Sequence, residues 1–210
     1  MMKKIILTLL LFCIAGLGAN AQKLIWGGKI SGGVAYQQIR NPDILSTGDV
    51  RTFNIKGIVQ MPLKNDFWLE GGLGIANKGG VFYQDALTTT LHLTYLELPV
   101  DLQRKFNFTN LGKFYLGAGG YIARGIGGDI DYETPGVANT DKLKYGKNND
   151  IRRYDVGLDF TTGFEFRNQV TFNMGYKLGL NNIESIPQQD AGTSVMRNRE
   201  FTVGLGYLLK

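Results

Sequence analysis

Two pairs of carboxylates are the residues of this chain whose spacing could support acid–base chemistry. Glu97 and Asp101 are four residues apart, as are Asp155 and Asp159, and each pair lies in a segment where apolar and polar residues alternate. In a β-strand such a pair projects from one face, two pleats apart. Two facing carboxylates are the machinery of glycoside hydrolysis. An ion-paired filling of a narrow interior explains the same spacing, so both hypotheses stand at this point.

Other catalytic signatures are weak or missing. His92 is the sole histidine, so a histidine-rich metal site is excluded and any Ser-His-Asp triad must use it. No G-x-S-x-G motif accompanies it. The glycine runs at 71–74 and 117–120 are followed by strand-like residues rather than a helix, so they lack the anion-binding mechanism of a phosphate loop. We therefore predict a non-enzymatic protein with no catalytic, cofactor or metal site.

The segment 125–150 is predicted to be the longest loop, and it mixes acidic and basic residues. Its carboxylates are Asp129, Asp131, Glu133 and Asp141, and its lysines are Lys142, Lys144 and Lys147. Spaced carboxylates can hold calcium, but EF-hand spacing is absent. The mixed charge favours a solvated loop instead. If the protein recognises something outside the cell, this loop is the first candidate for the contact.

The first residues carry an export signal. Lys3 and Lys4 precede an apolar run from 5 to 17, which is too short to span a bilayer, and 19–21 reads Ala-Asn-Ala. We predict a signal peptide at 1–21 and a mature domain at 22–210; a short membrane anchor is the alternative. Cys13, the only cysteine, lies in the apolar run, so a disulfide framework is excluded. The formal charge of +5 includes both signal lysines and is too scattered to indicate nucleic-acid binding.

Eight later segments alternate large apolar residues with small or polar ones, as β-strands with two unlike faces do. These segments are 24–38, 52–63, 67–76, 94–106, 113–123, 154–166, 170–180 and 200–210. Short connections at 64–66, 107–112 and 167–169 alternate with long ones at 39–50, 77–93, 124–153 and 181–199. Transmembrane barrels sort their loops in this way. The pattern predicts an all-β, eight-stranded antiparallel up-and-down transmembrane β-barrel in the bacterial outer membrane.

The side-chain volumes indicate which face meets lipid. A soluble lipocalin-like barrel would turn its large apolar residues inward, but an eight-stranded barrel has little interior space for them. We therefore predict that the large residues face lipid, and that Leu158→Arg impairs insertion more than the inward Gly157→Ala. Pro99 cannot donate to the ladder and predicts a bulge. Aromatic girdle positions are predicted at Trp26, Tyr36, Phe67, Trp68, Phe166 and Tyr207.

With this facing, a cluster of charged residues lines the lumen. Its members are Lys29, Lys56, Glu70, Glu97, Asp101, Asp155, Asp159, Glu165 and Lys177. Unpaired buried charges are costly, so these residues should pair with one another or keep water. A polar plug is the simplest interpretation for so narrow a barrel. The sharper interpretations are an ion path and a binding pocket.

Four segments resemble the PorT-like outer-membrane β-barrel domain of Bacteroidetes. They are "YLELPVDLQRKF", "FYLGAGGYIA", "VTFNMGYKLGLNNI" and "RNREFTVGLGYLL", in that order along the chain. The last strand is similar to the signal read by the barrel-assembly machinery, with Thr202, Gly204, Tyr207 and Leu209 at the matching positions and Lys210 where an aromatic residue is usual. The resemblance implies the fold and the location, and some relatives serve in protein secretion.

The expected function follows from the plugged lumen. We predict a small monomeric outer-membrane barrel with a structural, binding or secretion-associated role. The alternative is a passive channel for small ions or solutes, lined by six of the nine charged residues: Lys29, Lys56, Glu97, Asp101, Asp159 and Lys177. An enzyme acting on lipid or peptide is disfavoured. The expected partners are outer-membrane lipid, the barrel-assembly machinery and an extracellular or secretion-system protein bound by the long loops, with no nucleic acid.

Overall fold

The computed structural model describes residues 24–40, 45–146, 149–185 and 195–209. The predicted signal peptide and its alternative, the membrane anchor, therefore lie outside the described residues. The described residues form nine strands: β1 Ile25–Arg40, β2 Ser46–Pro62, β3 Phe67–Gln84, β4 Leu87–Phe108, β5 Gly112–Thr134, β6 Val137–Lys142, β7 Tyr154–Phe166, β8 Val170–Gly179 and β9 Val195–Leu209.

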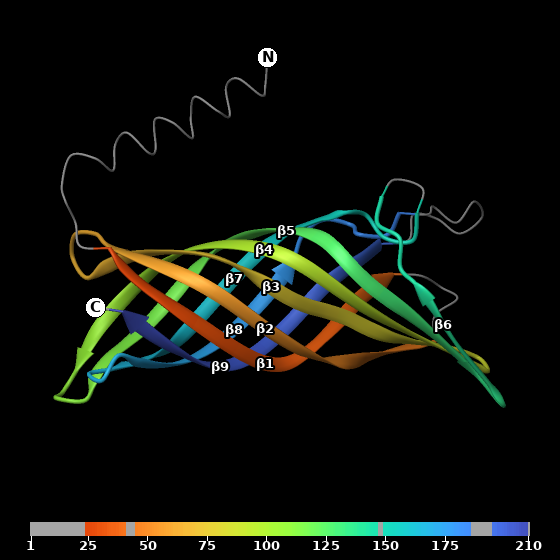
Figure 1. The fold of residues 1–210 in the computed structure, drawn as a ribbon, viewed down its shortest axis with the longest axis horizontal. Coiled ribbons are helices and arrows are strands. Elements are labelled where there is room, and N and C mark those ends of the chain that lie inside the picture. Colours follow the sequence, from red (N-terminus) through yellow and green to blue (C-terminus); the bar gives the residue numbers. More distant parts are fainter. Residues whose placement is uncertain (1–23, 41–44, 147–148, 186–194, 210) are drawn as a thin grey trace, which may run out of the picture.

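Eight of these strands close into a ring, which confirms the predicted barrel. The hydrogen-bonded order is β4-β3-β2-β1-β9-β8-β7-β5-β6, and β4 also pairs with β5. Every ladder is antiparallel, and β1 meets β9 from Trp26–Leu209 to Arg40–Val195. The ninth strand, β6, pairs with residues 129–134 of β5 and lies outside the ring (Figure 1). Because the ring has no free edge, its backbone hydrogen bonds are satisfied internally.

The two ends of the barrel differ. At one end, here called the turn end, short turns at 63–66, 109–111 and 167–169 connect the strands, and β1 begins there as β9 ends. At the opposite loop end the strands run far beyond the predicted limits, so the expected loops 77–93 and 124–153 are wrong in part. β3 and β4 meet in a tight hairpin at 85–86, and β5 and β6 form a second hairpin (Figure 1).

The strands extend because the alternation of buried and exposed side chains continues beyond the segments whose exposed residues are large and apolar. Leu91, Leu93 and Tyr95 are buried while His92 is exposed, and Asp85 adopts a left-handed φ of 44° that closes the hairpin. The predicted bulge at Pro99 is wrong, because the β3–β4 and β4–β5 registers are the same on both sides of it. Register shifts occur instead between Gly48 and Asn54 and at the Thr94–Tyr95 step.

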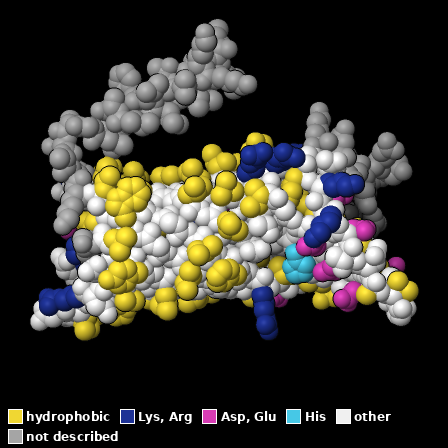
Figure 2. All heavy atoms as spheres, viewed as in Figure 1, with side chains coloured by type: hydrophobic (Ala, Val, Ile, Leu, Met, Phe, Trp, Pro, Cys, Tyr) yellow, Lys and Arg dark blue, Asp and Glu magenta, His cyan; other side chains and the backbone are white. Residues whose placement is uncertain are grey.

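The outer wall of the ring carries an apolar band, as the alternation predicts. Figure 2 shows the hydrophobic side chains spread over the barrel wall, with most charged side chains gathered at the loop end. Trp26, Phe53, Leu73, Ile122 and Leu205 are among the large side chains that are at least half exposed. Such an area of exposed apolar surface requires an apolar medium. Within the described residues, no helix is long and apolar enough to cross a membrane.

Glycines on the inner wall make room for neighbouring side chains. A Cβ added at Gly157 would lie 2.4 Å from the Leu178 carbonyl oxygen and 2.6 Å from the Tyr121 ring. Gly157→Ala is therefore an unsuitable control for Leu158→Arg, because backbone and a packed ring would both have to move. The outward Gly28 is a better small-residue control, since its added Cβ would meet only the Lys56 carbonyl oxygen at 3.8 Å.

Because Leu158 and Gly28 both lie on the outer wall, substitutions at these two positions should differ strongly in their effect on stability. Leu158→Arg places a charge in the apolar band and should lower the free energy of unfolding in bilayers by about 2 kcal/mol, which destabilises the barrel. Gly28→Ala, on the same wall, should change it by less than about 0.5 kcal/mol. Urea titration of protein refolded into lipid vesicles measures both. Equal stability of Leu158→Arg and wild type would show that Leu158 does not meet lipid.

Candidate functional site

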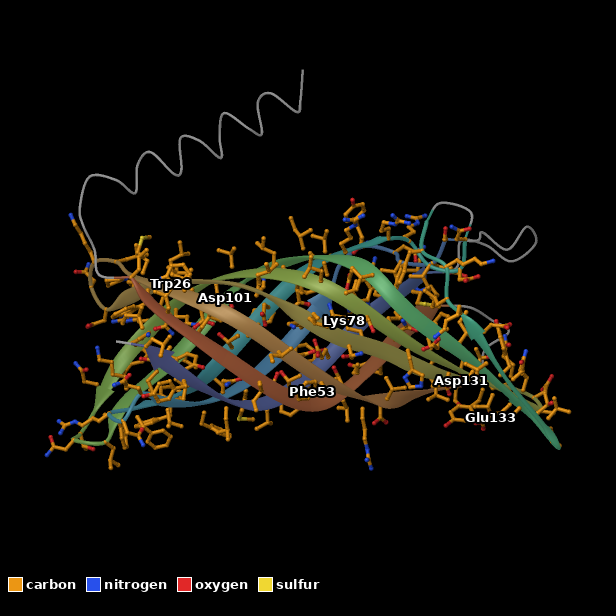
Figure 3. The ribbon with its side chains drawn as sticks, in the orientation of Figure 1. Trp26, Phe53, Lys78, Asp101, Asp131 and Glu133 are labelled. Carbon is orange, nitrogen blue, oxygen red and sulfur yellow. The ribbon has the colours of Figure 1, made fainter. Side chains whose placement is uncertain are left out.

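The lumen brings together the charged residues predicted from the alternation. Of the nine, Lys56 is partly buried, and the other eight are buried: Lys29, Glu70, Glu97, Asp101, Asp155, Asp159, Glu165 and Lys177. Figure 3 shows side chains along the barrel, with Trp26 toward the turn end and Asp131 and Glu133 near β6 at the loop end. The charged lumen is therefore the densest cluster of titratable groups in the described chain and the candidate site.

Three lumen charges escaped the prediction, namely Lys78, Lys105 and Glu200. Each lies on the same strand face as a predicted member, so the alternation contained the signal. Lys105 follows Asp101 by four residues, and Glu200 precedes the inward Thr202 by two. Lys78 was assigned to a loop, because β3 was expected to end at 76.

Toward the turn end, two ion pairs share one glutamine. Lys29 Nζ lies 2.6 Å from Glu70 Oε1, and Lys105 forms an ion pair with Glu165. Gln60 connects them: its amide nitrogen donates to Glu70 at 2.9 Å and to Glu165 at 3.1 Å, and its oxygen accepts from Lys105 at 2.8 Å. These residues come from β1, β2, β3, β4 and β7, so the network braces the ring across its interior.

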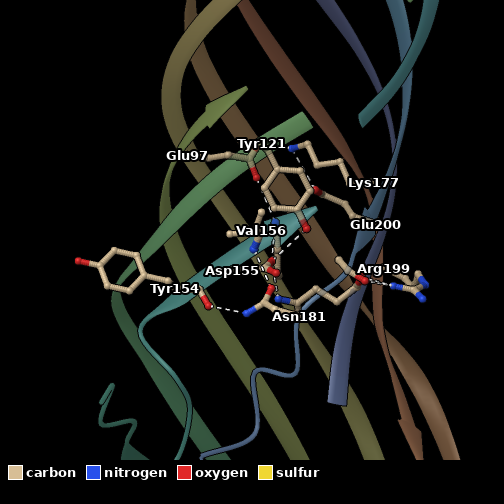
Figure 4. A network of polar contacts seen from close by, with 12 residues as sticks. Glu97, Tyr121, Tyr154, Asp155, Val156, Lys177, Asn181, Arg199 and Glu200 are labelled. Atoms are coloured by element: carbon tan, nitrogen blue, oxygen red, sulfur yellow. Dashed lines mark hydrogen bonds and ion pairs between the residues drawn. The ribbon is translucent and has the colours of Figure 1, made fainter. Parts of the chain in front are cut away.

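Toward the loop end, two lysines bridge three carboxylates. Figure 4 shows one of the two lysines, Lys177, with Glu97 and Glu200. Lys78 Nζ lies 3.1 Å from both Glu97 and Asp155, while Lys177 pairs with Glu97 and lies 3.2 Å from Glu200. Neutral groups also donate to these carboxylates: Asn54 and Thr52 donate to Glu200 at 2.6 and 2.9 Å, and Asn198 and Tyr121 donate to Asp155 at 2.9 and 3.1 Å. Buried ions of this kind are stable only with such partners; Asp155 accepts through Oδ2, and its Oδ1 has no hydrogen-bond partner among the described residues.

Asp101 and Asp159 lie between the two networks and differ from the other lumen carboxylates because neither forms an ion pair within the described residues. Both are at most 1 % exposed, and both oxygens of Asp159 and one of Asp101 lack a hydrogen-bond partner among the described residues. Asp159 and Lys56 line a cavity of about 30 Å³, which has room for one or two water molecules. Four of the five lumen lysines pair with five of its seven carboxylates, which leaves Asp101, Asp159 and Lys56 outside the ion pairs of the described residues.

An apolar layer, here called the inner cap, closes the lumen at the turn end. It consists of Ile25, Ile58 and Leu208, with Trp68 packed against them. The girdle assignment of Trp68 is therefore wrong: its side chain points inward, and Lys105 Nζ lies 4.1 Å from its ring centroid. The physical reason is the strict alternation of β3, which places 68 on the same face as Glu70.

A larger apolar layer, the outer cap, closes the loop end. Its buried members are Phe82, Leu91, Leu93, Tyr95, Tyr121, Ala123, Ile130, Leu143, Tyr145, Ile151, Ile183 and Met196. Tyr145 comes from the segment after β6, and its ring packs edge-on against Tyr95 with centroids 5.8 Å apart. Burial raises the pKa of the Tyr145 hydroxyl above its usual value, and the protonated group donates to the Gly127 carbonyl oxygen at 3.2 Å.

The remaining sequence-predicted residues lie outside the lumen network or on its rim. Thr202 and Gly204 face the lumen and Tyr207 and Leu209 face outward, as the alternation of the last strand requires; their role in assembly stays a prediction. His92 lies on the outer face of β4, with its Nε2 3.5 Å from Asp131.

The carboxylates of the predicted loop 125–150 lie mainly on paired strands. Asp129 binds Lys142 at 2.6 Å, and Asp131 accepts from Thr140 at 2.7 Å. In the part of the chain that the structure describes, no three His, Cys, Asp or Glu residues are placed to hold a metal ion.

Comparisons with known proteins agree with this architecture. The family model described as "Outer membrane protein beta-barrel domain" matches residues 20–185. The solved structure of OprG from Pseudomonas aeruginosa is similar with a TM-score of 0.53 and 12% identity, covering 91% of this chain and 98% of OprG. A comparison with curated protein sequences finds no match.

Two further solved structures are less similar. The Neisserial surface protein A gives a TM-score of 0.43 at 15% identity and covers 88% of this chain and 96% of that one. The attachment invasion locus protein Ail of Yersinia pestis gives 0.40 at 15% identity, covering 87% and 98%. The likeness to OprG, at 12% identity, shows a shared fold alone.

The unequal partnering of lumen carboxylates predicts opposite effects of neutralisation. Asp159→Asn removes an unpaired buried charge and should stabilise the barrel by about 1 kcal/mol. Glu97→Gln leaves Lys78 and Lys177 short of a partner and should destabilise it by about 3 kcal/mol. Urea unfolding of both variants in vesicles at neutral pH measures the difference. A loss for Asp159→Asn as large as that for Glu97→Gln would show that Asp159 is paired.

Proposed function

The chain belongs to the outer membrane protein beta-barrel domain family, and on that premise we propose that this barrel of the bacterial outer membrane does not conduct and acts by binding at its loop end. The filled lumen is the observation that carries the proposal. Ion pairs span the interior, the inner cap and the outer cap cover both ends, and the cavity beside Asp159 measures about 30 Å³. A hydrated ion has no continuous path through such packing.

The loop end has the character of a recognition surface. Within the described residues, paired strands around the outer cap form much of it, so the shape of that part is held before a partner arrives. Its outer faces combine the carboxylates Asp129, Asp131 and Glu133 with exposed apolar side chains such as Leu45 and Val137, which are 71% and 65% exposed. A mixture of charge and isolated apolar side chains suits a protein partner.

The partner class follows from the resemblance to PorT-like barrels. We infer an extracellular or secretion-system protein bound at the loop end, with lipid around the apolar band and the barrel-assembly machinery engaged during biogenesis through the last strand. The barrel acts as a monomer and has no enzymatic activity in this proposal. Its support is the absence of a nucleophile–base pair around His92 among the described residues, since His92 contacts Asp131 on the outer wall.

The alternative, a passive channel, has one observation in its favour. Asp159, which forms no ion pair within the described residues, lines the small cavity, where a cation could be attracted. Conduction would also require opening both caps and separating Lys29 from Glu70 and Lys177 from Glu97. Breaking one buried ion pair alone is unfavourable by about 3 to 5 kcal/mol, which favours the closed barrel.

Conductance in planar bilayers tests the proposal. The refolded wild-type protein, shown to be folded by its heat-dependent gel mobility, should give no single-channel steps at any applied voltage that the bilayer tolerates. Asp159→Asn serves as the matched control, because a conducting lumen would change its step size and selectivity. Reproducible steps in wild type that change in Asp159→Asn would overturn the non-conducting barrel and establish the channel.

Cysteine labelling tests which end faces the outside. The described residues contain no cysteine, so single cysteines introduced by Asn139→Cys in β6 and Lys64→Cys in the 63–66 turn report each end separately. Intact cells treated with a membrane-impermeant maleimide should label only Asn139→Cys, because long connections face outward and short turns face the periplasm. Permeabilised cells, the control, should label both variants. Labelling of Lys64→Cys alone in intact cells would place the proposed binding surface in the periplasm.

A further inference from the structure

Two arginines on adjacent strands stand free at the loop end of the barrel wall. Arg40 ends β1 and Arg197 lies near the start of β9, and both side chains are exposed. Neither forms an ion pair with a carboxylate in the described part of the chain, whereas every buried lysine of the ion-pair networks does. Two unpaired guanidinium groups side by side repel each other unless an anion joins them.

The register places both arginines on one face. Gln38 is opposite Arg197 in the β1–β9 ladder, and Arg40 is two residues further along β1, so the three side chains point outward together. Arg199, buried, holds Gln38 in place: its Nη2 donates to Gln38 Oε1 at 2.6 Å, and its Nη1 donates to the carbonyl oxygens of Gly179 and Asn198 at 2.7 and 2.9 Å. The floor between the two free arginines is therefore fixed.

A pocket occupies this position. Its volume is about 140 Å³, and it is lined by Gln38, Ile39, Arg40, Val195 and Arg197. About 10 to 15 Å³ of such volume is enough for one water molecule, so the pocket admits a group of several heavy atoms, such as a phosphate. Arginine binds phosphate oxygens in a two-pronged geometry that two neighbouring guanidinium groups can share.

The position of the pocket along the barrel axis indicates the source of the phosphate. Tyr36 and Tyr176 lie just below it on β1 and β8, with hydroxyl oxygens 3.5 Å apart, where tyrosines mark the boundary between the apolar band and water. Lipid phosphates lie at this same level in a bilayer. We propose that Arg40, Arg197 and Gln38 form a binding site for the phosphate of an outer-leaflet lipid, with the adjoining apolar band receiving its acyl chains.

Lipid binding to the full-length mature barrel tests this site. Native mass spectrometry of the detergent-solubilised protein, titrated with phosphatidic acid and separately with phosphatidylcholine, gives the affinity for an exposed and a blocked phosphate. The wild type should bind phosphatidic acid about tenfold more tightly than phosphatidylcholine. The double variant Arg40→Gln/Arg197→Gln should lose about tenfold in affinity for phosphatidic acid, as expected for the loss of charge-assisted hydrogen bonds. Heat-dependent gel mobility establishes that each variant is folded.

A charge-matched control separates a built site from general attraction. Arg124 and Arg152 are also exposed arginines of the loop end but lie outside the pocket, so Arg124→Gln/Arg152→Gln should bind phosphatidic acid within twofold of wild type. Equal losses in both double variants would overturn the site in favour of diffuse electrostatics. Inorganic phosphate is the second probe: if it displaces phosphatidic acid at equal concentration, the pocket takes free phosphate and the lipid assignment is wrong.

Discussion

Closing eight strands into one ring is the constraint on which the rest of this structure depends. The ring satisfies the backbone in a medium without water, but it also forces half of every strand into an interior just wide enough for side chains. Large apolar residues consequently lie outside, and the inner wall must be filled by small residues and by polar ones that satisfy one another. The pairing of Lys29 with Glu70 and of Lys78 with Glu97 and Asp155 follows from that confinement.

One continuous sheet meets two solvents. In the band, Leu96, Leu98 and Val100 of β4 face outward while Glu97 and Asp101 are buried; beyond it, Leu91 and Leu93 are buried while His92 is exposed. Along β4 the side-chain facing does not change, but the polarity of each face inverts near the Thr94–Tyr95 register shift. The extended strands therefore have a core like that of a soluble protein, and this outer cap seals the polar lumen beneath it.

The sequence predicts facing far better than it predicts strand ends or partners. Period-two alternation assigned Lys29, Glu97 and Asp159 to the lumen correctly, because that period follows from backbone geometry alone. Strand ends were missed, because the loss of outward apolar residues at 77 and 124 was taken for the end of the strand rather than of the lipid band. The pairs could not be predicted: Lys105 and Glu165 are 60 residues apart and meet across a ring whose register is a tertiary property.

A polar interior serves export as well as folding. Replacing buried ion pairs by apolar residues is often neutral or stabilising in a folded protein, so stability alone does not require seven carboxylates and five lysines in the lumen. Their positions at every second residue or multiples of it, however, keep each strand from forming an apolar run of about 20 residues, which would be retained as a membrane helix. The same charges that prevent retention must then be neutralised when the ring closes. The pairs Lys177–Glu97 and Lys78–Asp155 join strands three positions apart in the ring, so they form only when the barrel closes, which couples neutralisation of these lumen charges to completion of the fold.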